Sequence, residues 1–183
     1  ANEFGSSSSK LMTNLVNKFH PHSIGETGLD FYRNISSYEE QIYAFDKQIK
    51  ISIDTQKPLF LHQRDANEDF VKTIKPYRHD IKKAVVHCFT VTQKELDEYL
   101  ELGFYIGLTG WICDERRNID LRKSIKNIPL ERLMIETDCP YLIPRNLNNK
   151  PKNNRNEPAH LPHIANEIAA LINLDRNELI DIT

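Results

Sequence analysis

Several features that would place this chain in a broad class of proteins are missing from its sequence. Its 183 residues contain no apolar run near the roughly 18 residues that a membrane helix requires, so we expect a soluble protein with no membrane partner. The net charge of -2 and the isoelectric point of about 6.4 exclude an overall basic field, so nucleic-acid binding would need a local basic patch. Cys88, Cys113 and Cys139 have no paired spacing, which favours a reducing compartment, the cytoplasm or alternatively the nucleus.

The length of the chain is sufficient for one domain with a substantial core, and we expect residues 1–183 to form a single domain. Two segments within it lack the apolar spacing of helices and strands. Residues 1–10 are rich in serine and are expected to be a loop or an artificial leader. Residues 139–160 contain four prolines and many Asn, Lys and Arg residues, which predicts a long loop.

Short apolar segments alternate with segments of helical spacing over most of the chain. The apolar segments predict strands at residues 24–26, 59–62, 84–87, 104–108 and 133–135. Between them, Ser37 with Glu40 and Thr92 with Glu95 have the spacing of a capping box, which marks the start of a helix. Residues 27–34 are predicted to form the loop after the first strand. This alternation is typical of βαβ units and predicts an α/β fold with a parallel sheet.

Four of the apolar segments lead into a residue that can bind a metal ion, namely Glu26, His62, His87 and Asp138. Functional groups of parallel α/β folds gather at the carboxyl ends of the strands, so we expect these side chains to converge. Two imidazoles and two carboxylates suit Zn²⁺, Mn²⁺, Co²⁺ or a hydrated Mg²⁺. Taken singly, each has another interpretation, since such a His is often structural and such a carboxylate often caps a helix.

Basic residues follow the same strand ends and form a candidate phosphate-binding set. The members chosen for substrate binding are Arg64, Arg116, Arg117 and Arg155. They would form an anion-attracting rim on a mildly acidic protein, although surface loops are also commonly basic by chance. Tyr32, Trp111 and Tyr141 lie near strand ends as well, where they can either stack on bases or pack within loops.

Six ordered tracts of the chain resemble the TatD-type metal-dependent deoxyribonucleases. They are Ile-Gly-Glu-Thr-Gly-Leu-Asp (24–30), Leu-His-Gln-Arg-Asp (61–65), Val-His-Cys-Phe (86–89), Gly-Leu-Thr-Gly-Trp-Ile-Cys-Asp-Glu-Arg-Arg (107–117), Ile-Glu-Thr-Asp-Cys-Pro-Tyr-Leu (135–142) and Arg-Asn-Glu-Pro-Ala-His-Leu-Pro (155–162). The resemblance implies a TIM (β/α)8 barrel with one or two metal ions at its mouth. The predicted strands match only the fourth to eighth of the family, so we expect an incomplete barrel, the C-terminal part of a longer protein or a short form.

The resemblance also implies an activity and roles for the candidate residues. The expected reaction is hydrolysis of phosphodiester bonds in DNA, single-stranded or at duplex ends, as a 3′ to 5′ exonuclease; RNA is a second candidate substrate. Glu26 resembles the bridging metal ligand, His62 and His87 resemble ligands of one ion, and Asp138 resembles the acidic ligand that handles the attacking water. Mg²⁺ is the implied cofactor, with Mn²⁺ and Zn²⁺ as alternatives, and a monomer is expected.

Two other functions remain open from the sequence. The same barrel and ligands serve metal-dependent hydrolysis of amides or of aminoacyl esters on tRNA, and the basic loop after Asp138 does not distinguish these from phosphodiester cleavage. Alternatively, a chain without the first strands of the barrel is an inactive scaffold or binding form.

Overall fold

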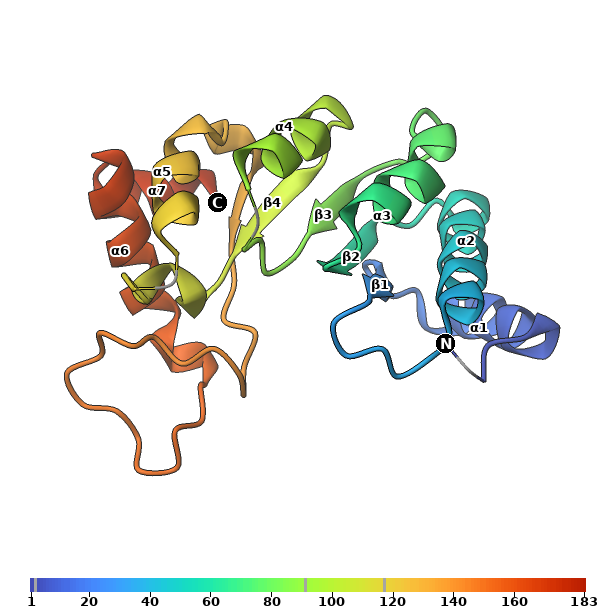
Figure 1. Cartoon of the computed structure of the whole chain (residues 1–183), viewed down its shortest axis with the longest axis horizontal. Coiled ribbons are helices and arrows are strands. Elements are labelled where there is room, and N and C mark those ends of the chain that lie inside the picture. Colours follow the sequence, from blue (N-terminus) through green and yellow to red (C-terminus); the bar gives the residue numbers. More distant parts are fainter. Residues whose placement is uncertain (2, 91, 117) are drawn as a thin grey trace. The chain divides into compact units, whose positions relative to one another are not determined.

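The computed structural model describes residues 1, 3–90, 92–116 and 118–183 of the chain (Figure 1). The helices and strands in order are α1 (Ser6–Phe19), β1 (Ile24–Asp30), α2 (Tyr38–Thr55), β2 (Leu59–Arg64), α3 (Asn67–Ile74), β3 (Ala84–Val86), α4 (Gln93–Glu101), β4 (Tyr105–Leu108), α5 (Ile119–Ser124), β5 (Leu133–Ile135), α6 (Leu161–Ile172) and α7 (Arg176–Ile182). Short 3₁₀ helices are η1 (Lys75–Tyr77), η2 (Gly110–Cys113), η3 (Ile125–Asn127), η4 (Leu130–Arg132) and η5 (Pro158–His160). The predicted α/β class and the predicted alternation of strands and helices are confirmed.

The chain forms two compact units, which are described separately below. The first unit comprises residues 1–86 together with residues 102–104, and the second comprises residues 87–101 and 105–183. The first therefore contains β1, β2 and β3, whereas the second contains β4 and β5. The single domain expected from the length of the chain stays a prediction.

The first unit is a parallel sheet covered by helices. β1 pairs with β2, and β2 pairs with β3, both in parallel. Phe45 of α2 and Phe70 of α3 are fully buried, and their rings stack with centroids 5.1 Å apart. Leu29 and Leu61, on adjacent strands, are also fully buried. Burying one such side chain stabilises the fold by roughly 1.5–3 kcal/mol, so this core holds the strand ends in place.

The N-terminal segment differs from its prediction. Residues 6–10, expected in a loop, form the first turns of α1, which packs beside α2 (Figure 1). The hydroxyl of Ser8 accepts a hydrogen bond from the backbone N–H of Gly5 at 3.1 Å. The N–H group just before the helix therefore has an acceptor. Serine hydroxyls readily bond to nearby backbone groups, and the serine-rich composition is therefore compatible with a helix start.

The second unit also has a parallel strand pair packed against helices. β4 pairs with β5, with Ile106 opposite Leu133 and Leu108 opposite Ile135. Phe89 and Tyr99 are almost fully buried and pack edge to face with ring centroids 6.2 Å apart. Residues 139–157, after β5, form turns and irregular structure before η5 and α6.

None of the helices formed by the described residues combines the length and the apolar character that crossing a bilayer requires.

Candidate metal centre

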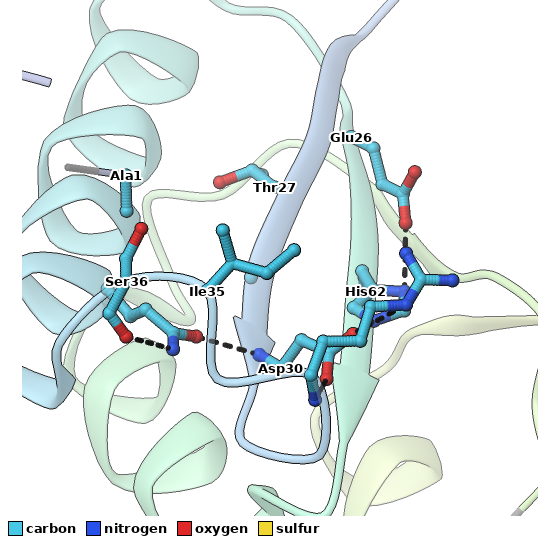
Figure 2. A pocket seen from close by; sticks show the side chains of 10 residues that line it. Ala1, Glu26, Thr27, Asp30, Ile35, Ser36 and His62 are labelled. Atoms are coloured by element: carbon cyan, nitrogen blue, oxygen red, sulfur yellow. Dashed lines mark hydrogen bonds and ion pairs between the residues drawn. The ribbon is translucent and has the colours of Figure 1, made fainter. Parts of the chain in front are cut away.

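Glu26 and His62 lie on adjacent strands of the first unit and face each other. The Nδ1 atom of His62 lies 2.8 Å from the Oε1 atom of Glu26 (Figure 2). The pairing of β1 with β2 shifts register between Ile24 and Thr27, which is where Glu26 lies. Such an irregularity re-aims a side chain. Two of the four predicted ligands therefore have adjacent donor atoms.

A close approach of the two strands makes this geometry depend on Gly28. Its backbone has φ of 148°, and a Cβ atom placed there would lie 1.8 Å from the carbonyl oxygen of His62. No residue with a side chain fits at that position without moving β2. The prediction that residues 27–34 form a loop is wrong at its start, because Gly28 lets the ladder continue from Thr27 to Asp30.

The donor set fits a divalent cation. Ligand atoms lie roughly 2.0–2.2 Å from a bound Zn²⁺ or Mg²⁺, so two neighbouring ligands are expected about 3 Å apart. The separation of 2.8 Å between Glu26 and His62 agrees with this spacing. The carboxylate of Glu26 is about half exposed, so it can also reach solvent ligands. One oxygen and one nitrogen donor suit Mg²⁺, Mn²⁺ and Zn²⁺ alike, and the pair does not select one ion.

Asp30, which sequence reasoning did not single out, is a second carboxylate beside His62. Its Oδ2 atom lies 3.3 Å from Nε2 of His62. Both ring nitrogens of His62 are thus next to carboxylates, Glu26 on one side and Asp30 on the other. Asp30 ends the tract Gly28-Leu29-Asp30, and extending β1 to that residue would have revealed it at the strand end.

A pocket of about 330 Å³ opens beside these groups (Figure 2). It is lined by polar and apolar groups in about equal measure, from β1, β2, the loop after β1 and the start of α2, with Ile35 as an apolar wall. Its lining residues are Ala1, Glu26, Thr27, Gly28, Asp30, Arg33, Ile35, Ser36, Gln41 and His62. A hydrated cation and a small anionic group could both enter such a pocket.

His87 lies in the second unit, directly after β3, and it is buried. Its Nδ1 atom is 3.7 Å from Oε2 of Glu136, whose other oxygen accepts the backbone N–H of Cys88 at 2.5 Å. Glu136 was also missed by sequence reasoning, which selected Asp138 two residues further on. The signal was the same strand end, since Glu136 directly follows β5. Each of the two candidate histidines thus has a carboxylate partner.

Asp138 lies in the turn after β5, held by a network around the backbone. Asp138 is half-buried, and its backbone has φ of 54°. Its carbonyl oxygen accepts a hydrogen bond from the backbone N–H of Tyr141 at 2.9 Å. The side-chain amide of Asn156 donates to the carbonyl oxygens of Thr137 at 2.8 Å and Leu142 at 3.3 Å, and its backbone N–H donates to that of Pro140 at 3.0 Å. Asn156 therefore ties the end of the long loop to the turn that carries Asp138.

The candidate phosphate-binding arginines have different surroundings. The guanidinium of Arg64 lies over the ring of Tyr32, with its carbon 3.7 Å from the ring centroid. Arg155 is exposed, and its backbone N–H donates to the side chain of Asn153 at 3.1 Å. Arg117 lies outside the described residues. Arg64 and Arg155 thus present cationic groups at the surface, as a substrate contact would require.

Arg116 is engaged by a buried carboxylate. Both its backbone N–H and its Nε atom are 3.3 Å from Oδ1 of Asp114, and Nε of Arg145 is 3.5 Å from Oδ2. Burial alone would raise the pKa of Asp114, but the hydrogen bonds from Arg116 and the charges of Arg116 and Arg145 outweigh it and hold that pKa below its usual value. The charge of Arg116, which was predicted to bind phosphate, is therefore partly balanced by the carboxylate of Asp114.

Comparison with known proteins decides the family. Residues 6–183 match the sequence profile of the family TatD related DNase. The chain belongs to this family. Among curated members it is 53% identical over 161 residues to "3'-5' ssDNA/RNA exonuclease TatD" of Rahnella sp. (strain Y9602), covering 88% of this chain and 61% of that protein. With the protein of the same name from Escherichia coli (strain K12) it shares 52% identity over 147 residues, covering 80% of this chain and 56% of that protein.

Solved structures of the TatD family show the same fold. The TatD homologue YJJV from Escherichia coli K12 matches with a TM-score of 0.86 at 23% identity, over 98% of this chain and 68% of that one. A TatD family hydrolase from Entamoeba histolytica matches with a TM-score of 0.85 at 28% identity, over 97% and 66%. The five strands fit part of the TIM barrel of these neighbours, as the resemblance predicted. The chain spans about three fifths of the length of the curated relatives it matches.

Proposed function

We propose that this protein is a metal-dependent deoxyribonuclease that hydrolyses phosphodiester bonds as a 3′ to 5′ exonuclease, with RNA as a second substrate. The observation that carries the proposal is the facing pair Glu26 and His62, at 2.8 Å, in a member of the TatD family. Relatives about half identical to this chain are named as exonucleases of single-stranded DNA and RNA. We further propose a monomer, located in the cytoplasm because the three cysteines without paired spacing favour a reducing compartment.

The proposed ligands are Glu26, His62, His87 and Asp138, which supply oxygen and nitrogen donors. Glu26, His62 and His87 each offer one ligating atom. We take Mg²⁺ as the native cofactor, with Mn²⁺ and Zn²⁺ as alternatives, at one or two ions per site.

A bound divalent ion lowers the pKa of a coordinated water and withdraws electrons from the scissile phosphate. The roles of the protein follow from its donors and cations. Glu26, His62 and His87 would hold the ion, and Asp138, a further ligand, would accept the proton of the attacking water. Arg64, Arg116 and Arg155, with Arg117 beyond the described residues, contact the phosphates of the substrate strand through charge-assisted hydrogen bonds.

The decisive experiment follows cleavage of a 5′-labelled single-stranded DNA in Mg²⁺. Glu26→Ala and Asp138→Ala are expected to lose at least about a hundredfold in rate, in line with loss of a catalytic proton acceptor or metal ligand. The exposed Glu131→Ala serves as a matched control and should cleave like the wild type. Near-normal cleavage by either folded site variant would overturn the assignment.

Parallel assays separate this function from the two alternatives. Aminoacylated tRNA is incubated with the same preparation, and release of the amino acid without DNA cleavage would show an ester hydrolase instead. The metal content of the purified protein is measured by mass spectrometry. Absence of both bound divalent ion and chelator-sensitive cleavage would show an inactive scaffold. Cleavage of DNA that EDTA abolishes supports the nuclease.

A further inference from the structure

We propose that Asp30 is a positioning residue that fixes the ring and the tautomer of His62, so that Nδ1 of His62 is the atom offered to the metal ion. The inference rests on the proposed function and names a residue that the ligand set does not include. Its basis is the pair of contacts on either side of the imidazole. Nε2 lies 3.3 Å from Oδ2 of Asp30, whereas Nδ1 lies 2.8 Å from Glu26 (Figure 2).

Asp30 is itself held by the chain around it. The backbone N–H of Arg33 donates to Oδ1 of Asp30 at 2.8 Å, and Nε of Arg33 lies 3.7 Å from Oδ2. The backbone N–H of Asp30 donates to the side-chain oxygen of Gln41 at 2.9 Å, and the amide of Gln41 donates to the carbonyl oxygen of Ser36 at 3.0 Å. Gln41 is buried, so α2 and the loop after β1 together fix the carboxylate.

The two oxygens of Asp30 therefore have separate tasks. Oδ1 closes the turn after β1 by accepting from Arg33, and Oδ2 faces the imidazole of His62. A carboxylate used only to close the turn would not need its second oxygen directed at a ring nitrogen. The side chain of Asp30 is only 18% exposed, which reduces competition from water for that oxygen.

The chemistry of a neutral imidazole makes this contact consequential. A neutral ring carries one N–H, and the nitrogen without hydrogen is the one that binds a metal ion. With an ion bound by Nδ1 and Glu26, the hydrogen of the neutral ring lies on Nε2, which donates it to Asp30. Carboxylates that hold a ligand histidine in this way typically contribute 10–100-fold to metal affinity. In the absence of the ion, Glu26 at 2.8 Å draws the hydrogen to Nδ1, and Asp30 opposes that exchange by favouring Nε2–H.

The test compares wild type with Asp30→Asn, which keeps the shape of the side chain, and with Asp54→Asn, an exposed control on α2. Mn²⁺ affinity is measured by calorimetry, and the His62 tautomer is measured by ¹⁵N NMR in metal-free protein at high pH, with His62→Gln assigning the signal. We expect Asp30→Asn to bind Mn²⁺ 10–100-fold more weakly and to shift the tautomer from Nε2–H toward Nδ1–H. The control should match wild type in both.

The outcomes separate this inference from the proposed function. A folded Asp30→Asn protein with unchanged affinity and unchanged tautomer overturns the positioning role. Should Asp30→Asn fail to fold, Asp30→Glu retains the charge and is expected to keep the wild-type share of the Nε2–H tautomer with weaker Mn²⁺ binding; a shift toward Nδ1–H in that variant would overturn the role. A protein that shows both effects but cleaves no DNA would refute only the nuclease, because neither readout needs a substrate.

Discussion

Gly107 on β4 leaves no room for a side chain beside the carboxylate of Glu136. A Cβ atom at position 107 would lie 2.5 Å from Oε1 of Glu136 and 3.2 Å from Cα of His87. The carboxylate that contacts His87 can therefore occupy its position only while residue 107 is glycine. Gly107 on β4 thus sets the position of Glu136, the carboxylate beside the candidate ligand His87.

Gly107→Ala should destabilise the protein by roughly 1–3 kcal/mol, because the added methyl overpacks a buried site. Urea unfolding would measure the change. Gly5→Ser is a control, since a Cβ atom at position 5 meets nothing within 4 Å and serine is a good helix cap. Equal stability of Gly107→Ala and wild type would contradict this cost and would show that the carboxylate of Glu136 moves aside freely.

Asp114 should make stability depend on pH in the acid range. Its pKa is lower in the folded protein than in the unfolded chain, so its contribution is complete above the unfolded value of about 4 and is lost as the pH falls through the folded value. We expect Asp114→Asn to be less stable at neutral pH and to lose less on acidification. Urea midpoints between pH 3 and pH 7 test this, with the exposed Asp181→Asn as the control. Parallel pH curves for Asp114→Asn and wild type would refute it.

Cys113 should resist alkylation in the native protein. Burial, together with the nearby charge of Glu167, raises the pKa of its thiol to about 12, so very little reactive thiolate exists at pH 8. Cys139 is exposed and should react readily with iodoacetamide. Mass spectrometry of peptides from native and urea-unfolded protein measures both. Labelling of native Cys113 as fast as Cys139 would show that the core around η2 opens.

Under the proposed function, Tyr32 is placed to stack on a substrate base. Its ring is 63% exposed and carries the guanidinium of Arg64 on one face. Because stacking contributes roughly 1–3 kcal/mol per base, Tyr32→Ala should bind single-stranded DNA about tenfold more weakly. Fluorescence anisotropy with a non-hydrolysable oligonucleotide measures this affinity.

Tyr43 provides the matched control for that experiment. It is 43% exposed and has the ammonium of Lys47 5.3 Å from its ring centroid, but it lies on α2 and not in the loop after β1. Tyr43→Ala should leave the affinity unchanged. Similar losses in the two tyrosine variants would mean that Tyr32 has no specific role in binding.

The fold was predictable where the signal is local. Ser37 and Glu40 form the reciprocal hydrogen bonds of a capping box, as their spacing predicted. Asp65 and Glu68 have the same spacing in the sequence, but α3 begins at Asn67 with Ala66 as its N-cap and has no side-chain cap hydrogen bond. The backbone N–H of Ala66 donates to the side chain of Gln63 on β2, a contact with a strand that local spacing does not show.

The candidate site was predictable in part for a similar reason. That Glu26 and His62 would be neighbours follows from the parallel order of strands, and the structure has them at 2.8 Å. Their roles as ligands, with those of His87 and Asp138, stay predictions. Asp30 and Glu136 escaped notice because which of several strand-end carboxylates meets a histidine depends on register, and the register of β1 shifts within the strand.

The hydrogen bonds of Asn156 join the two ends of the loop after β5, because they link residue 156 to Thr137 and Pro140. A change in the length of this loop therefore need not be transmitted to β5 or α6. Residues 147–153, in the middle of the loop, are a suitable insertion point for a peptide tag or a fluorescent reporter, attached to the protein without disturbing the strands.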